Sequence, residues 1–143
     1  MNKIISYLVI VPFMFILLVK SITVFEFTIK QRYIKDYVDT VCDKVKITGV
    51  FTNSDLTAFV NEIEKFSDFG PGSISLRKGE YTNGLLGPSS PYTLGENLDR
   101  GDAFYITVKS TAVSTYSRVE NGGVSLDDSK NIYYSAKAQC RVE

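Results

Sequence analysis

The sequence predicts an α+β fold that combines a long N-terminal helix, a second short helix and a small antiparallel β-sheet. Three observations support this prediction. An uncharged apolar run covers residues 4–19, a helical pattern continues from it towards Gly49, and residues 102–143 contain two segments that alternate between apolar and polar side chains. We expect residues 1–29 to form a transmembrane anchor and residues 30–143 to form a stalk helix with one α+β head domain.

The first segment is long and apolar enough to cross a bilayer. Residues 4–19 carry no charge, and after Lys20 the apolar character returns with Glu26 as the only acid up to residue 29. A spanning helix needs about 20 residues for about 30 Å of hydrocarbon, and it tolerates a proline such as Pro12. We favour a retained anchor. The alternatives are a secretory signal cleaved after Ser21 and a buried core helix of a soluble protein.

Helical periodicity continues beyond the apolar run. Apolar side chains recur every three or four residues on one face, and charged side chains lie between them. No glycine or proline occurs between Pro12 and Gly49. We therefore expect one continuous helix from about residue 4 to about residue 46, half in lipid and half projecting as a stalk. The apolar face of this stalk consists of Ile34, Tyr37, Val38, Val41, Cys42 and Val45.

A second helix is predicted after Gly49. Thr52 and Asp55 have the spacing of a capping box, in which the side chains of the N-cap and N3 residues bond each other's backbone N–H groups. The apolar residues that follow lie on one helical face, and the sequence 69–72 (FGPG) ends the helix. They are Leu56, Phe59, Val60, Ile63 and Phe66.

The rest of the chain is predicted to be strand and loop. Residues 70–101 hold seven of the ten glycines and three of the four prolines, so we expect a strand at 73–81 and then a long loop at 84–101. This loop is either a surface excursion or a subunit contact. Residues 102–118 and 131–143 are rich in β-branched, aromatic and alternating side chains, which predicts an antiparallel pair with one solvated face.

Composition argues against most kinds of chemistry. The 16 basic and 16 acidic residues balance, and without a basic run the chain has no electrostatic signature of nucleic-acid binding. Histidine, the commonest general base and metal ligand, is absent. The glycine-rich region lacks the following helix that a phosphate loop needs. We predict no enzymatic activity, catalytic residue, metal, cofactor or small-molecule substrate.

The two cysteines are candidates for one disulfide. Cys42 lies on the apolar face of the stalk helix, and Cys140 lies on the apolar face of the last predicted strand. Because the two faces should pack together, the sulfurs should converge. We expect a disulfide if the domain is exported and two buried thiols if it is not.

Glu26 is a single acid among apolar neighbours near one end of the anchor. It is either an interfacial carboxylate among hydrated headgroups or a contact to a cation on a neighbouring subunit, because an acid near lipid is costly without a partner.

Residues 9–49 resemble TadE-like minor pilins, or pseudopilins, of the tight-adherence type IV pilus family. The shared features are an apolar run that contains a proline, here Pro12, a Glu-aromatic step, here Glu26-Phe27, and a long amphipathic helix. The family's processing glutamate would fall near Ser6, and this sequence has no glutamate there. The resemblance implies a pilin-like structural subunit, and it makes Glu26 and Pro12 candidate intramembrane or subunit contacts.

The same resemblance implies partners and a location. The chain would be a single-pass cell-membrane protein that contacts lipid, copies of itself or other pilin-like subunits, and a membrane assembly platform of a pilus, secretion or conjugation apparatus. Its head would be extracytoplasmic, whereas the positive-inside rule, applied to Lys30, Arg32 and Lys35, would place the head in the cytosol. The alternative function is a bitopic accessory or binding module that does not enter a filament.

Overall fold

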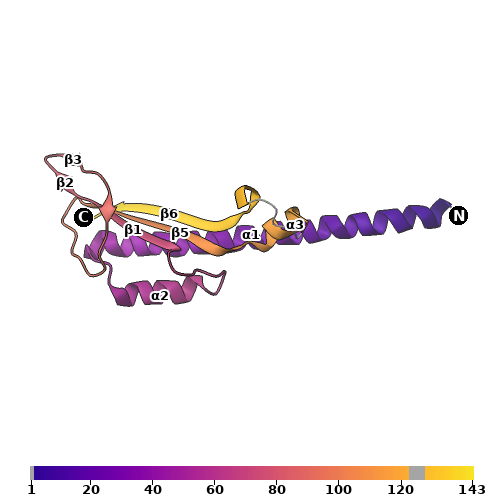
Figure 1. The fold of residues 1–143 in the computed structure, drawn as a ribbon, viewed down its shortest axis with the longest axis horizontal. Coiled ribbons are helices and arrows are strands. Elements are labelled where there is room, and N and C mark those ends of the chain that lie inside the picture. The colour runs from indigo at the N-terminus through magenta and orange to yellow at the C-terminus, as the bar shows by residue number, and fades with distance from the viewer. Residues whose placement is uncertain (1, 123–127) are drawn as a thin grey trace.

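The computed structural model describes residues 2–122 and 128–143, and it has the predicted α+β fold. One long helix runs the length of the molecule, and the sheet and the second helix lie alongside its C-terminal part (Figure 1). The elements are α1 (Asn2–Thr48), α2 (Asn53–Ile63), β1 (Ile74–Gly79), β2 (Tyr81–Thr82), β3 (Leu85–Leu86), β4 (Ser90–Pro91), β5 (Ala103–Val113), α3 (Thr115–Glu120), a 3-10 turn (Asp128–Lys130) and β6 (Tyr133–Arg141).

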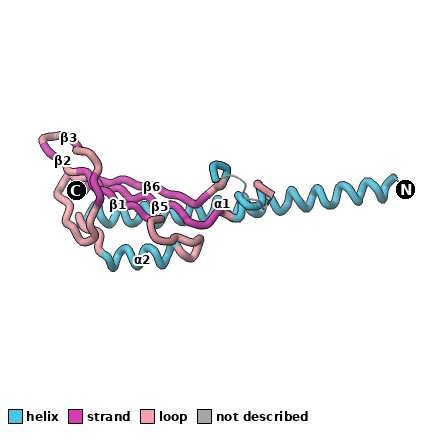
Figure 2. Tube along the Cα trace, viewed as in Figure 1, coloured by secondary structure: helices cyan, strands magenta, loops and turns pink. Residues whose placement is uncertain are grey.

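Helix α1 confirms the prediction of one continuous helix. It has 47 residues, contains Pro12 and is about 70 Å long at about 1.5 Å per residue. It ends at Thr48 and is followed by Gly49, whose φ of 67° is in the left-handed region and whose N–H donates to the Val45 carbonyl at 2.8 Å. Its N-terminal part projects as a bare rod beyond the head (Figure 2).

The main sheet has the strand order β4-β1-β5-β6, and every neighbouring pair is antiparallel. Ile106 lies at the centre, opposite Leu76 on β1 and Ala138 on β6. Side chains alternate between the two faces of each strand. The buried residues of β5 and β6 that face α1 include Phe104, Ile106, Val108, Tyr134 and Ala136.

The core lies between this sheet and α1. Ile34, Val38 and Val45 of the predicted stripe are completely buried, and Cys42 is buried beside them. Helix α2 packs beside α1 and adds buried apolar residues to the same cluster. Its predicted cap is present: Thr52 Oγ1 accepts from the Asp55 N–H at 3.3 Å, and the Asp55 carboxylate accepts from the Thr52 N–H at 3.1 Å.

Several predicted elements have different bounds in the structure. Helix α2 ends at Ile63, before Phe66 and before the sequence 69–72 that was expected to end it. The strand predicted at 102–118 ends at Val113, because buried Ser114 caps a new helix, α3, by accepting the Ser117 N–H at 3.2 Å. The loop predicted at 84–101 contains two short strands, β3 and β4. Strand β4 pairs with β1, where Pro91 lies opposite Arg77. It is the edge strand of the sheet, a position that tolerates a proline because the missing N–H is not needed for a further strand.

Candidate functional site

The N-terminal third of α1 is an apolar rod that the rest of the chain does not cover. Each residue from 3 to 18 is exposed, including Leu8 at 72% and Phe15 at 66%. The described part of the chain has one helix that is long and apolar enough to cross a membrane, and this rod is its apolar part. A core helix of a soluble domain would be covered by its own chain, so the structure argues against that alternative.

The head begins to pack on α1 at about residue 20. Lys20 Nζ lies 3.3 Å from the carboxylate of Glu120 in α3, and the Thr23 side chain is buried. One turn later, the Phe27 ring stacks on Tyr134 with 5.1 Å between centroids. The domain boundary predicted between residues 29 and 30 therefore falls within the stretch of α1 that the head covers. Residues 3–19 remain free, about 25 Å of helix, which is close to the thickness of a bilayer core.

Glu26 and Pro12, the two predicted contact residues, lie apart. Pro12 is exposed within the free rod, and Glu26 is more than three turns further along α1. The Glu26 carboxylate has a cation in its own helix, since Lys30 Nζ lies at 2.6 Å. The spacing of four residues was visible in the sequence and identifies this pair. Glu26 therefore does not require a cation from a neighbouring subunit.

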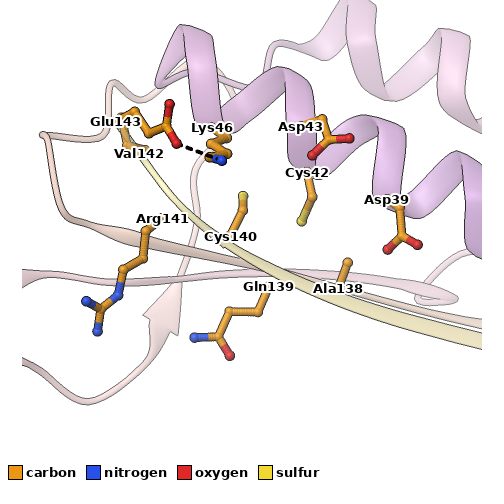
Figure 3. A pocket seen from close by; sticks show the side chains of 10 residues that line it. All are labelled: Asp39, Cys42, Asp43, Lys46, Ala138, Gln139, Cys140, Arg141, Val142 and Glu143. Atoms are coloured by element: carbon orange, nitrogen blue, oxygen red, sulfur yellow. Dashed lines mark ion pairs between the residues drawn. The ribbon is translucent and has the colours of Figure 1, made fainter.

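Cys42 and Cys140 lie next to each other, as the sequence predicts, and both thiols are free in this structure. Both sulfurs point into the space between α1 and β6 (Figure 3). Cys42 is buried and Cys140 is half-buried. They lie at a cavity of about 480 Å³, which Asp39, Asp43, Lys46 and the chain from Ala138 to Glu143 also line.

The two thiols differ in acidity because of their mutual hydrogen bond. Donation by the Cys42 thiol lowers the pKa of Cys140, because it stabilises the Cys140 thiolate. The same bond, together with burial and the charges of Asp39 and Asp43, raises the pKa of Cys42 above its ordinary value. Cys140 is therefore both the more accessible of the two sulfurs and the one that ionises more readily. Whether the pair forms a disulfide stays a prediction.

The outer face of the sheet carries a cluster of positive charge that sequence reasoning missed. Arg77 on β1, Lys109 on β5, and Lys137 and Arg141 on β6 are exposed and share the face that points away from α1. None of these four cations has a carboxylate within ion-pair distance among the described residues. Alternation in single strands predicts a polar face, but only the register of three strands brings the cations together.

Neutral groups contact three of the four cations of this basic face. Lys109 Nζ lies 4.5 Å from the centre of the Tyr133 ring, and the Arg141 guanidinium lies 5.7 Å from that of Tyr81. The Arg77 guanidinium donates to the Ser89 carbonyl at 2.7 Å. Neutral partners leave the positive charge of the face uncompensated.

No family model, no curated protein and no solved structure matches this chain. These comparisons neither support nor refute the expected resemblance of residues 9–49 to TadE-like minor pilins. Among the described residues, no three His, Cys, Asp or Glu side chains are grouped so that they could hold a metal ion.

Proposed function

We propose that this chain is a membrane-anchored structural subunit, similar to a minor pilin, of a pilus, secretion or conjugation apparatus. The observation that carries the proposal is the continuity of α1. One helix is bare and apolar over residues 3–19, and it is the central packing element of the head from Lys20 to Thr48. Since no linker separates anchor from head, a force or rotation applied to one is transmitted to the other.

This rigid connection suits a part that assembles laterally in a bilayer. A tethered binding module benefits from a flexible linker, because a linker lets the module search for its partner. Here the head contacts the helix immediately after the free rod, through the Lys20–Glu120 pair and the packing of Phe27. Neighbouring copies in one membrane would therefore present their heads at a fixed height and tilt. The proposed partners are lipid, further copies or related subunits, and a membrane assembly platform.

Self-association of the full chain in a membrane tests the proposal. A photo-reactive residue at Phe13, which is exposed on the free rod, should cross-link two copies in native membranes. The same residue at Thr57, on the exposed surface of α2, is the control for random collision. A chain that stays monomeric in the membrane until a different protein is added would instead be a bitopic accessory module, and the structural proposal would be wrong.

We also propose that the head is extracytoplasmic. The family resemblance and the pair of adjacent thiols favour export, whereas Lys30, Arg32 and Lys35 favour a cytosolic head by the positive-inside rule. A Ser89→Cys variant that lacks both native cysteines places one thiol on an exposed loop. A membrane-impermeant maleimide should label it in intact cells. Labelling that requires cell lysis would place the head in the cytosol.

A further inference from the structure

The basic face of Arg77, Lys109, Lys137 and Arg141 points sideways with respect to the anchor. Strands β5 and β6 run along α1, so the outer face of the sheet is parallel to the axis of the helix (Figure 1). When α1 spans a bilayer, this face is directed parallel to the membrane plane. It can therefore contact a neighbouring protein beside the molecule, but not the lipid headgroups beneath the head.

An acidic stripe lies on α1, and two of its residues, Asp39 and Asp43, line the cavity beside β6 that Arg141 also lines. Asp36, Asp39 and Asp43 are exposed on α1 at spacings of three and four residues, which places them on one helical face. None of them has a cation within ion-pair distance among the described residues. Arg141 points away from Asp43, so the two charges do not meet within one chain (Figure 3).

The acidic stripe and the basic face lie at the same height above the anchor. Strand β6 runs parallel to α1: the Ser135 N–H donates to the Gln31 side chain at 3.2 Å, and the Glu143 N–H donates to the Lys46 carbonyl at 3.0 Å. Gln31 and Ser135 therefore mark one level. From there, Lys137 is about 7 Å and Arg141 about 20 Å further along the strand, at about 3.4 Å per residue.

The same calculation along the helix gives matching positions. From Gln31, Asp36 is about 7.5 Å and Asp43 about 18 Å further, at about 1.5 Å per residue. Lys137 therefore stands at the level of Asp36, and Arg141 stands within about 2 Å of the level of Asp43. Two copies in one bilayer can bring these charges together without either copy moving along the membrane normal.

We propose that the basic sheet face of one copy binds the acidic stripe on α1 of a second copy in the same membrane. The proposed interface makes a second copy of this chain the partner in the structural role proposed above, and it rests on that role. The two surfaces differ, so each copy offers one of each kind and the contact can repeat from copy to copy. Pairing also relieves the repulsion between Asp39 and Asp43, which are four residues apart on one face.

Charge reversal in the full-length protein tests the interface. Wild-type chains reconstituted in neutral phosphatidylcholine vesicles should form dimers that a carbodiimide links between Lys137 or Lys109 and the acidic stripe. Lys137→Glu/Arg141→Glu should lower the dimer yield about tenfold, because reversal replaces attraction with like-charge repulsion. Here the yield is measured by energy transfer between two fluorescently labelled populations, so that loss of the Lys137 amine, which the carbodiimide would otherwise link, does not itself lower the signal. The matched control, Arg100→Glu/Lys130→Glu, reverses two exposed cations outside the face and should leave the yield unchanged.

Complementation identifies the partner. Chains that carry Lys137→Glu/Arg141→Glu should pair again with chains that carry Asp36→Lys/Asp43→Lys, and isotopic labelling of one chain shows that the links are intermolecular. If the mixture does not recover, the basic face binds some other acidic molecule and the interface is wrong. If the wild type dimerises through other peptides, the interface is wrong and the structural role stands. If the wild type forms no dimers at all, the structural role itself fails.

Discussion

Oxidation of the Cys42–Cys140 pair should stabilise the head strongly. The bond would join β6, the last strand, to α1, and so close a loop of about a hundred residues. In the chain-entropy model a disulfide that closes a loop of that length raises the free energy of unfolding by about 4.7 kcal/mol, because the cross-link restricts the unfolded chain. For a head of roughly 120 residues, about 4 °C per kcal/mol corresponds to a rise of about 15–20 °C in Tm.

The geometry of the thiols predicts the course of the oxidation. The more exposed Cys140, whose pKa is lowered by the Cys42 thiol, should attack the disulfide of an oxidising exchange partner as a thiolate. Cys42 then gives up its proton and displaces the partner from the mixed disulfide. The pair loses two electrons, and the partner leaves as a dithiol.

Thermal unfolding of the detergent-solubilised full chain, followed by near-UV circular dichroism, measures the effect. Oxidised protein should melt about 15–20 °C higher than the same protein in dithiothreitol. The matched control is Cys140→Ala, which removes the half-buried sulfur and should melt at one temperature in both conditions. Cys42→Ala is a less suitable control, since it empties a buried site in the core.

Two results would refute this reasoning. Alkylation of protein from its native membrane could label both cysteines without reductant, which would show that the bond is absent in the cell. Alternatively, the oxidised and reduced chains could melt together while mass spectrometry confirms the bond between Cys42 and Cys140. In that case native-state strain would cancel the loop-closure entropy.

Three further substitutions test the head. Asp55→Ala should cost about 1 kcal/mol at neutral pH, measured by urea unfolding, since it removes half of the capping box of α2. The Lys44 ammonium lowers the pKa of Asp55 below its ordinary 3.8, so the stability difference should be complete above that pH and close as the pH falls below it. A difference that does not shrink as the pH falls below 3.8 would contradict the assignment. Gly101→Ala should cost more than about 1 kcal/mol, because φ is 97° and the new Cβ would lie 2.9 Å from the Tyr81 ring; a neutral effect would show that this turn can relax. Phe104→Ala should cost about 3–5 kcal/mol, since the ring is completely buried, and a loss below 1 kcal/mol would show that the core repacks around it.

Much of the fold could be predicted because it depends on local patterns. The unbroken run of helix formers between Pro12 and Gly49 determines the extent of α1, and the Thr52–Asp55 spacing determines the start of α2. Alternation along β6 assigns Cys140 to the apolar face, and helical spacing assigns Cys42 to the same core. Each of these inferences needs only residues that are close in the chain, because hydrogen bonding in helices and pleating in strands act over a few residues.

Features that involve distant residues were missed or only partly predicted. The strand expected up to residue 118 ends early because the Ser114 hydroxyl donates to the Ile132 carbonyl at 2.8 Å, a bond to a segment 18 residues away. The start of the head on α1 depends on Glu120 reaching Lys20, which is a hundred residues earlier. The charge pattern of neither segment reveals that contact.

The sequence by itself determined where the chain is apolar, where it is helical and which face of each element is buried, since the apolar side chains that mark these features recur every two to four residues. Only the tertiary structure decided which solvent-exposed side chains from different elements lie close together. The register of β1, β5 and β6 gathers Arg77, Lys109, Lys137 and Arg141 on one surface. The bond between Gln31 and Ser135 sets β6 level with α1 and so places Lys137 and Arg141 at the heights of Asp36 and Asp43. Neither follows from a pattern along the chain, because packing between distant segments decides both.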